Sequence, residues 1–172
     1  MSERATAAQV RIEPWAEKNL GLLSLMNAPE MMEHLGGPET EEQLRERHQL
    51  YLEIGSRGTG QMFTITLLPE QETVGSVGYW ESVWQEETVY EIGWSVLPQF
   101  QGRGIATLAV AAAIDRAREE RKHKRLHAFP SIDNPASNAI CRKLDFSFVT
   151  ECDFEYPPGS IMRCNNWCLE LS

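Results

Sequence analysis

A glycine-containing loop lies near the middle of the chain, between a strand-like segment and a strongly helical one. Residues 88–97 alternate β-branched and aromatic side chains, Pro98 ends strand pairing, and residues 105–121 follow a helical pattern. Gly102 and Gly104 allow positive φ and let a ligand approach the backbone closely. The helix that follows begins with unpaired N–H groups at the positive end of its dipole, so the segment predicts a site for phosphate or pyrophosphate.

The remaining elements predict a mixed sheet covered by helices on both faces. Residues 40 and 43, Thr and Gln, have the spacing of a capping box that opens the second helix, and Gly55 lies near its expected end. We expect a strand at 10–13, helices at 15–27 and 39–55, strands at 62–68, 73–84 and 88–97, a helix at 105–121, a strand at 125–130, a helix at 135–144, and strands at 148–154 and 164–171. The order β-α-α-β-β-β-α-β-α-β-β indicates an α/β fold in one domain spanning residues 1–172.

Composition excludes several classes of protein. A formal net charge of −9 argues against nucleic acid as the partner, because binding phosphates requires a basic face. No apolar run approaches the roughly 20 residues that cross a bilayer, and the N-terminus lacks the apolar stretch of a secretory signal. Cys164 and Cys168 have no nearby ligands that complete a zinc pattern, so no metal is expected. We therefore expect a cytoplasmic protein with reduced cysteines, without a nucleic-acid or membrane partner.

The loop permits three phosphate-binding interpretations, besides that of a turn with no ligand. A P-loop requires Lys-Ser/Thr after its last glycine, where this chain has Ile105 and Ala106. A dinucleotide fingerprint requires Gly or Ala at the position of Thr107, and it normally opens a parallel unit. The third pattern, Gln99-x-x-Gly102-x-Gly104-x-Ala106 after a Val-x-Pro approach, resembles the coenzyme A loop of the GNAT acetyltransferases.

A second segment, residues 133–146, resembles the later motif of the same family. Asn134 is followed by Ser137 at +3, and Lys143 begins a Lys-Leu-x-Phe ending in which Asp145 replaces the usual Gly. With serine at +3, the motif resembles that of the family branch that acetylates the N-termini of ribosomal proteins. Asn134 is also a plausible N-cap, with Pro135 at the first helical position, and capping is compatible with ligand contact.

The resemblance implies acetyl-CoA as co-substrate. It also implies that the two central strands splay at the coenzyme A site, with the pantetheine arm in the gap and main-chain N–H groups near the thioester carbonyl. The residues that the resemblance assigns to cofactor binding are Trp94, Ser95, Val96, Leu97, Gln99, Gln101, Gly102, Arg103, Gly104, Ile105, Ala106, Asn134, Ser137 and Lys143.

Two residues are candidates for proton transfer. Glu91 matches the glutamate base of several family members, although an exposed strand carboxylate is an equally good interpretation. Cys141 occupies the position at which many members carry a tyrosine acid. A thiol can donate a proton, but a small buried cysteine is more often a packing residue, and we favour packing.

The implied acceptor is a primary amine, on a small molecule or a protein N-terminus, attacked directly in a ternary complex. In this family the acceptor pocket lies between the segments that match residues 27–38 and 153–162, and Trp80 and Trp84 are candidates for one wall. The alternatives are a non-catalytic acyl-CoA-binding module, motivated by Cys141, and a hydrolytic or O-acyl-transfer activity. The expected assembly is a monomer or homodimer.

Overall fold

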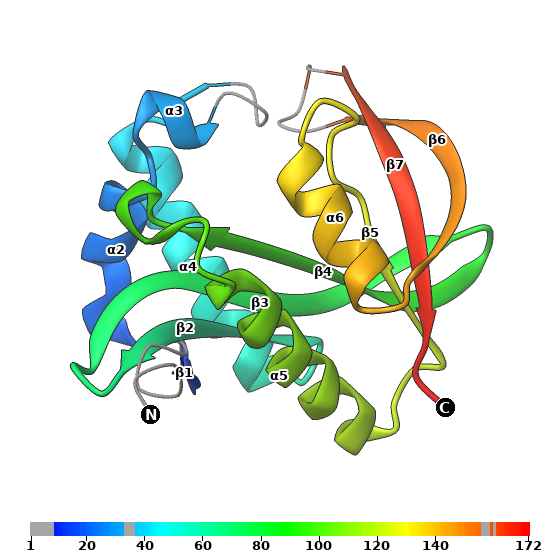
Figure 1. The fold of residues 1–172 in the computed structure, drawn as a ribbon, viewed down its shortest axis with the longest axis horizontal. Coiled ribbons are helices and arrows are strands. Elements are labelled where there is room, and N and C mark those ends of the chain that lie inside the picture. The colour runs from blue at the N-terminus through cyan, green and yellow to red at the C-terminus, as the bar shows by residue number, and fades with distance from the viewer. Residues whose placement is uncertain (1–8, 33–36, 156–158, 160) are drawn as a thin grey trace, which may run out of the picture.

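The computed structural model describes residues 9–32, 37–155, 159 and 161–172, and Figure 1 shows a twisted sheet with helices on both sides. Within these residues, seven strands form one sheet in the order β1-β2-β3-β4-β5-β7-β6. The elements are β1 (Gln9–Pro14), η1 (Glu17–Asn19), α2 (Leu20–Leu25), α3 (Pro29–Met32), α4 (Glu41–Arg57), β2 (Gly60–Leu68), β3 (Glu72–Trp84), β4 (Glu87–Val96), η2 (Pro98–Phe100), α5 (Ile105–Glu120), β5 (Arg125–Ala128), α6 (Pro135–Lys143), β6 (Ser147–Glu155) and β7 (Ile161–Glu170). The expected mixed α/β fold is confirmed.

The first four strands pair antiparallel in sequence order, and the sheet then changes direction. β4 pairs parallel with β5, and β7 lies between β5 and the edge strand β6, antiparallel to both. A parallel pair cannot be joined by a tight turn, so the chain crosses over through the loop and α5. The loop singled out by the sequence therefore starts this crossover, at the carboxyl end of β4.

Helix α5 packs closely against the sheet because its inner face is made of small residues. Ala109, Ala113 and Ala117 are fully or almost fully buried, and the helix contacts β1, β3 and β4. At the end of the helix, the hydroxyls of Tyr79 and Tyr90 each donate to the Glu120 carboxylate at 2.5 Å. These bonds fix the direction of α5, and with it the position of its N-terminus above β4.

Helix α4 lies on the opposite face, behind the sheet in Figure 1, where it packs against β2, and α2 packs against α4. Thr40 forms the expected capping box, since its Oγ1 accepts from the N–H of Gln43 and its own N–H donates to Gln43 Oε1 at 2.8 Å. The helix runs two residues past Gly55, to Arg57, and ends at Gly58 with a φ of 75°. The left-handed residue is therefore the next glycine along the chain.

The segment expected as one helix at 15–27 is instead a 3-10 turn followed by the short helix α2. Asn27 interrupts it, since its side chain donates to the carbonyl of Glu39 and accepts from the N–H of Glu39, at 2.8 and 2.7 Å. Pro29 then opens α3, a position where its missing N–H costs nothing. The side-chain bonds tie the segment to the chain just before α4, and this places α3 beside the cavities described below.

Candidate functional site

The loop after β4 has the geometry of an anion-binding helix start. Gly102 and Gly104 both have a φ of +79°, which is favourable only for glycine. Gly104 is the N-cap of α5 and offers no side chain to its first turn, so the opening N–H groups are unclaimed by a cap. A Cβ built on either glycine would meet no protein atom within 4 Å. The space above both glycines is thus open and fits a phosphate-bearing ligand.

The central strands separate just beyond the middle of β4. Pairing between β4 and β5 is limited to Tyr90 with Leu126 and Glu91 with His127, whereas β4 continues to Val96. The split expected in the sheet is therefore present. It begins immediately after Glu91.

The free edge of β4 faces this split. The N–H of Leu97 donates to the carbonyl of Val74 on the β3 side at 2.8 Å. Because successive residues of an antiparallel strand direct their polar groups to opposite sides, Ile92, Trp94 and Val96 direct theirs into the split. Main-chain donors and acceptors therefore line it at every second residue.

A cavity of about 490 Å³ runs from the loop along this edge to α6. Its walls include most of the residues expected to bind the cofactor: Trp94, Ser95, Val96, Gln101, Gly102, Gly104, Ile105, Ala106, Asn134, Ser137 and Lys143. Gln101 also braces the loop, since its side-chain amide donates to the carbonyl of Val96 at 2.8 Å. A cleft of this volume is large enough for a sizeable ligand.

Three expected cofactor residues do not line this cavity with their side chains. Leu97 is 6% exposed, within the core, and the side chain of Gln99 is exposed to solvent. The guanidinium of Arg103 lies over the ring of Phe100, 5.5 Å from its centroid. Their part in cofactor binding stays a prediction.

Asn134 caps α6, as expected, with its Oδ1 accepting from the N–H of Ser137 at 3.2 Å. Asn138, which the sequence reasoning missed, holds the preceding loop. Its amide donates to the carbonyls of Ser131 and Asn134 at 3.0 and 2.8 Å, and its Oδ1 accepts from the Trp167 indole. Asp145 adopts a φ of 69° at the position where the family motif has glycine, so Asp replaces Gly there without disturbing the turn.

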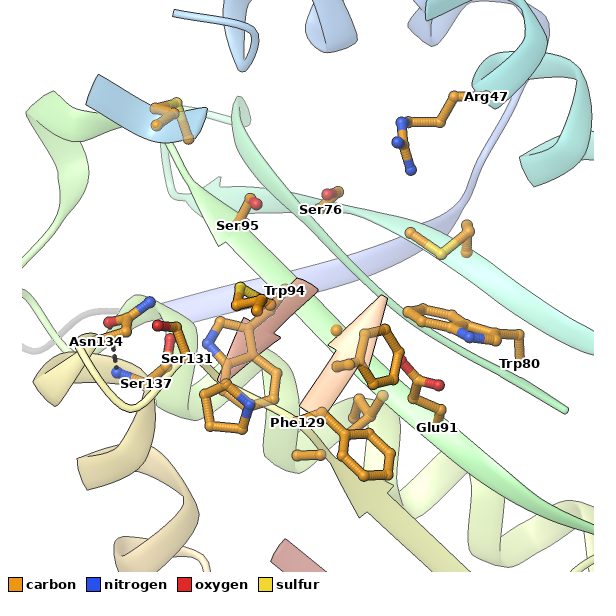
Figure 2. A pocket seen from close by; sticks show the side chains of 18 of the residues that line it. Arg47, Ser76, Trp80, Glu91, Trp94, Ser95, Phe129, Ser131, Asn134 and Ser137 are labelled. Atoms are coloured by element: carbon orange, nitrogen blue, oxygen red, sulfur yellow. Dashed lines mark hydrogen bonds between the residues drawn. The ribbon is translucent and has the colours of Figure 1, made fainter. Parts of the chain in front are cut away.

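A second cavity, of about 290 Å³, adjoins the first, and Figure 2 shows side chains that line it. Five residues line both: Met31, Trp94, Ser95, Asn134 and Ser137. The other residues that line it are Arg47, Tyr51, Met62, Ser76, Trp80, Glu91, Ile92, Gly93, Ala128, Phe129, Pro130, Ser131, Phe154 and Met162. A group at the junction is accessible from both cavities.

Glu91 lies in the wall of this second cavity, as Figure 2 shows, opposite Trp80 in the pairing of β3 with β4. Burial raises the pKa of its carboxyl from 4.5 to about 7, an increase reduced by hydrogen bonding to Ser82 and Trp80. A carboxyl with a pKa near 7 is suited to exchanging protons at neutral pH.

Cys141 is fully buried among core side chains and is absent from the lining of either cavity. Burial raises the pKa of its thiol to about 12. These surroundings favour packing, and a catalytic role for Cys141 stays a prediction.

The sequence reasoning located the second cavity in part. Met31 lies in the segment 27–38, and Phe154 and Met162 lie in the segment 153–162, both of which the family resemblance assigns to the acceptor pocket; residues 33–36, 156–158 and 160 of these segments lie outside the described residues. Trp80 was also anticipated, whereas Trp84 packs against the rings of His127 and Phe129 outside the cavity lining. Arg47, Met62 and Phe129 were missed, because they lie far apart in sequence and belong to no motif. The sequence did contain a further indication of the cofactor cleft. Helical spacing in α6 puts four residues on one face of that helix, and this face lines the cleft: Ala136, Ala139, Ile140 and Lys143.

Metal sites and membrane spans were not expected from the sequence. Among the described residues, no group of three or more His, Cys, Asp or Glu side chains is arranged to hold a metal ion. No helix in the described part of the chain is long and apolar enough to cross a membrane.

The open space above the two glycines and the free edge of β4 fit a long, phosphate-bearing ligand, and a carboxyl-bearing cavity meets this cleft. The acetyltransferase (GNAT) domain model matches residues 9–147, and the chain therefore belongs to the GNAT acetyltransferase family. The match confirms the expected enzyme class and acetyl-CoA as co-substrate. A comparison with curated proteins finds no match.

Solved structures agree with this fold. An acetyltransferase from Salmonella typhimurium that modifies the N-terminal serine of a 50S ribosomal subunit protein is 19% identical, with a TM-score of 0.78 over 97% of this chain and 98% of that one. The spermidine N-acetyltransferase of Vibrio cholerae, solved with CoA and spermine, is 16% identical, with a TM-score of 0.76 over 95% and 96%. A microcin self-immunity acetyltransferase, solved with acetyl-CoA and AMP, is 18% identical, with a TM-score of 0.78 over 94% and 92%.

Proposed function

We propose that this protein transfers the acetyl group of acetyl-CoA to a primary amine by direct attack within a ternary complex. One observation carries the proposal: the cofactor cleft and the second cavity meet at Trp94 and Ser95, and Glu91 lies on the side away from the loop. The two substrates would enter by different cavities, and their reacting atoms would meet at the junction.

The larger cavity suits coenzyme A. Its pyrophosphate would accept hydrogen bonds from the backbone N–H groups between Gly102 and Ala106, at the positive end of the α5 dipole. Lys143 lines the same cavity and adds a cation. The pantetheine arm would then run along the free edge of β4, where the polar groups of Trp94 and Val96 face the split.

The acceptor arrives as an ammonium ion, which has no lone pair for attack, so a base must remove one proton. Glu91 takes it in our proposal. The amine nitrogen then attacks the thioester carbonyl, and a main-chain N–H from the edge of β4 stabilises the oxyanion. As the intermediate collapses, the nitrogen loses its second proton to solvent and the C–S bond breaks, which leaves a neutral amide and releases the coenzyme A thiolate.

The departing thiolate needs little help from an acid, because a thiol has a reference pKa of about 8.5. Cys141 is buried away from both cavities, so we assign it to packing and leave protonation of the thiolate to solvent.

The free thiols of the four cysteines also support a cytoplasmic location, where cysteines are kept reduced.

The experiment is amine-dependent release of CoA by the wild-type protein and by Glu91→Gln at pH 7.5. We expect Glu91→Gln to lower kcat by about 10² or more, because a positioned base contributes at least that factor. Acetyl-CoA affinity, measured by calorimetry, should change little. Binding of acetyl-CoA without turnover of any amine would instead identify the acyl-CoA-binding module.

A further inference from the structure

The wall of the second cavity is rich in aromatic rings and thioethers. Apart from Arg47 and Glu91, the described residues around it are uncharged. Its aromatic and sulfur-containing side chains include those of Trp80, Phe129, Phe154, Met31, Met62 and Met162. Methionine sulfur and aromatic rings both make favourable contacts with an aromatic ligand.

The position of Trp80 depends on a neighbouring glycine. A Cβ built on Gly93 would lie 2.9 Å from the Cη2 atom of Trp80, closer than real contacts allow. Glycine at this point lets the indole lie against β4, next to Glu91, which is its register partner. The ring is therefore held beside the carboxyl, as Figure 2 shows.

Phe129 forms a second fixed aromatic surface. Its ring stacks on buried His127, with centroids 5.9 Å apart and planes 11° apart, and lies 5.2 Å from the ring of Phe154. Contacts with these rings and with that of Trp84 restrict its rotation, so the part of Phe129 that lines the cavity is preformed for a ligand. Preformed rings cost less conformational entropy on binding than mobile side chains do.

The charges in this cavity suit one ammonium group. Glu91 is the carboxylate that lines it among the described residues, and Arg47, which lies away from Glu91 in Figure 2, is ion-paired with Glu39 at 2.6 Å. The charge of Arg47 is therefore already matched, and the described lining offers no second carboxylate to a second ammonium, whose burial without a partner is costly. This distribution disfavours polyamines and favours an acceptor whose remaining part is uncharged.

We propose that the acceptor is a small arylalkylamine: one primary amine joined by a short linker to an aromatic ring. The ammonium binds between Glu91 and the face of Trp80, and the ring contacts Phe129, Phe154 and the methionines. A volume of about 290 Å³ lies at the lower end of the range for ligand sites, about 300 Å³, which fits a small molecule. This inference rests on the proposed acetyl transfer and specifies its substrate class.

The test compares kcat/KM for four acceptors: phenethylamine, cyclohexylethylamine, spermidine and a peptide that begins with serine. We expect phenethylamine to exceed its non-aromatic isostere by about three- to tenfold, the factor that an aromatic pair provides. It should exceed spermidine and the peptide by at least about tenfold, because the described lining offers spermidine no second carboxylate and a volume of about 290 Å³ is small for a peptide. Preference for spermidine or the peptide, or equal rates for the two isosteres, would overturn the inference but leave acetyl transfer intact. Acetyl-CoA binding with no amine turned over would overturn both.

Phe154→Leu tests the ring contact itself. We expect it to remove most of the preference for phenethylamine over cyclohexylethylamine, leaving the KM for acetyl-CoA within about twofold, because Phe154 lies outside the cofactor cleft. Phe154→Tyr should keep part of the preference. Trp80→Leu, which removes the ring beside the ammonium, should instead lower kcat/KM for both isosteres alike. Phe129→Leu replaces the first variant if that one does not fold, and an unchanged ratio in the folded leucine variant would contradict the proposed binding mode.

Discussion

Replacing Glu91 by glutamine should make the protein less active and, at neutral and alkaline pH, relatively more stable. Burial raises the pKa of the folded-state carboxyl to about 7, whereas its ordinary value is 4.5. The folded protein therefore holds this proton more tightly than the unfolded chain does. The stability that this group contributes is fully present below pH 4.5 and is lost as the pH rises through 7.

The size of this effect follows from the two pKa values. They differ by about 2.5, and each unit corresponds to about 1.4 kcal/mol, so the wild-type protein should lose about 3 kcal/mol that Glu91→Gln does not lose. The assay is urea denaturation of both proteins at pH 4.5 and pH 8. The comparison uses the change between the two pH values, so a constant cost of the glutamine side chain cancels.

A matched control is Glu72→Gln, which removes an exposed carboxylate at the start of β3. Its free energy of unfolding should follow the wild-type pH dependence. Parallel pH profiles for wild type and Glu91→Gln would refute the reasoning, because they would show that the carboxyl is not held in a site that disfavours its charge.

Three other outcomes are expected. The wild-type kcat/KM should rise as the pH passes through about 7, since Glu91 must be ionised to accept a proton, and a rate flat between pH 6 and 8 would remove it as the base. Gly102→Ala and Gly104→Ala should each lower the free energy of unfolding by about 1–2 kcal/mol through the left-handed φ, and thermal shift should show weaker stabilisation by acetyl-CoA because the new Cβ occupies the cradle. Cys141→Ala should keep kcat within about tenfold and cost about 1 kcal/mol of packing; a thousandfold loss in the folded variant would show that the thiol does chemistry.

The local features of this fold could be read from the sequence because neighbouring residues determine them. The capping box at Thr40 and Gln43, the end of β4 before Pro98 and the cap at Asn134 each depend on residues within a few positions. The split in the sheet came from resemblance to the family. No periodicity in the residues of β4 or β5 indicates where their pairing stops.

The second cavity could be predicted only in part, because its walls come together only in the folded protein. Met31, Phe154 and Met162 lie in segments that the family resemblance assigns to the acceptor pocket. Arg47 on α4 and Met62 on β2 lie far apart in sequence and carry no common motif. The break after α2 was missed for a related reason: the Asn27 side chain bonds to Glu39, twelve residues away, in place of a continued helix. Long-range side-chain contacts of this kind override local helical spacing.

The account is tested most directly by initial velocities of acetyl transfer with acetyl-CoA and phenethylamine both varied. Direct attack in a ternary complex predicts intersecting double-reciprocal lines, an N-acetylated amine as product, and no acetylated protein by mass spectrometry when acetyl-CoA is present alone. Parallel lines with an acetyl group on the protein would contradict it. They would show a covalent intermediate, whereas two cavities that meet at Trp94 and Ser95 let the two substrates react directly.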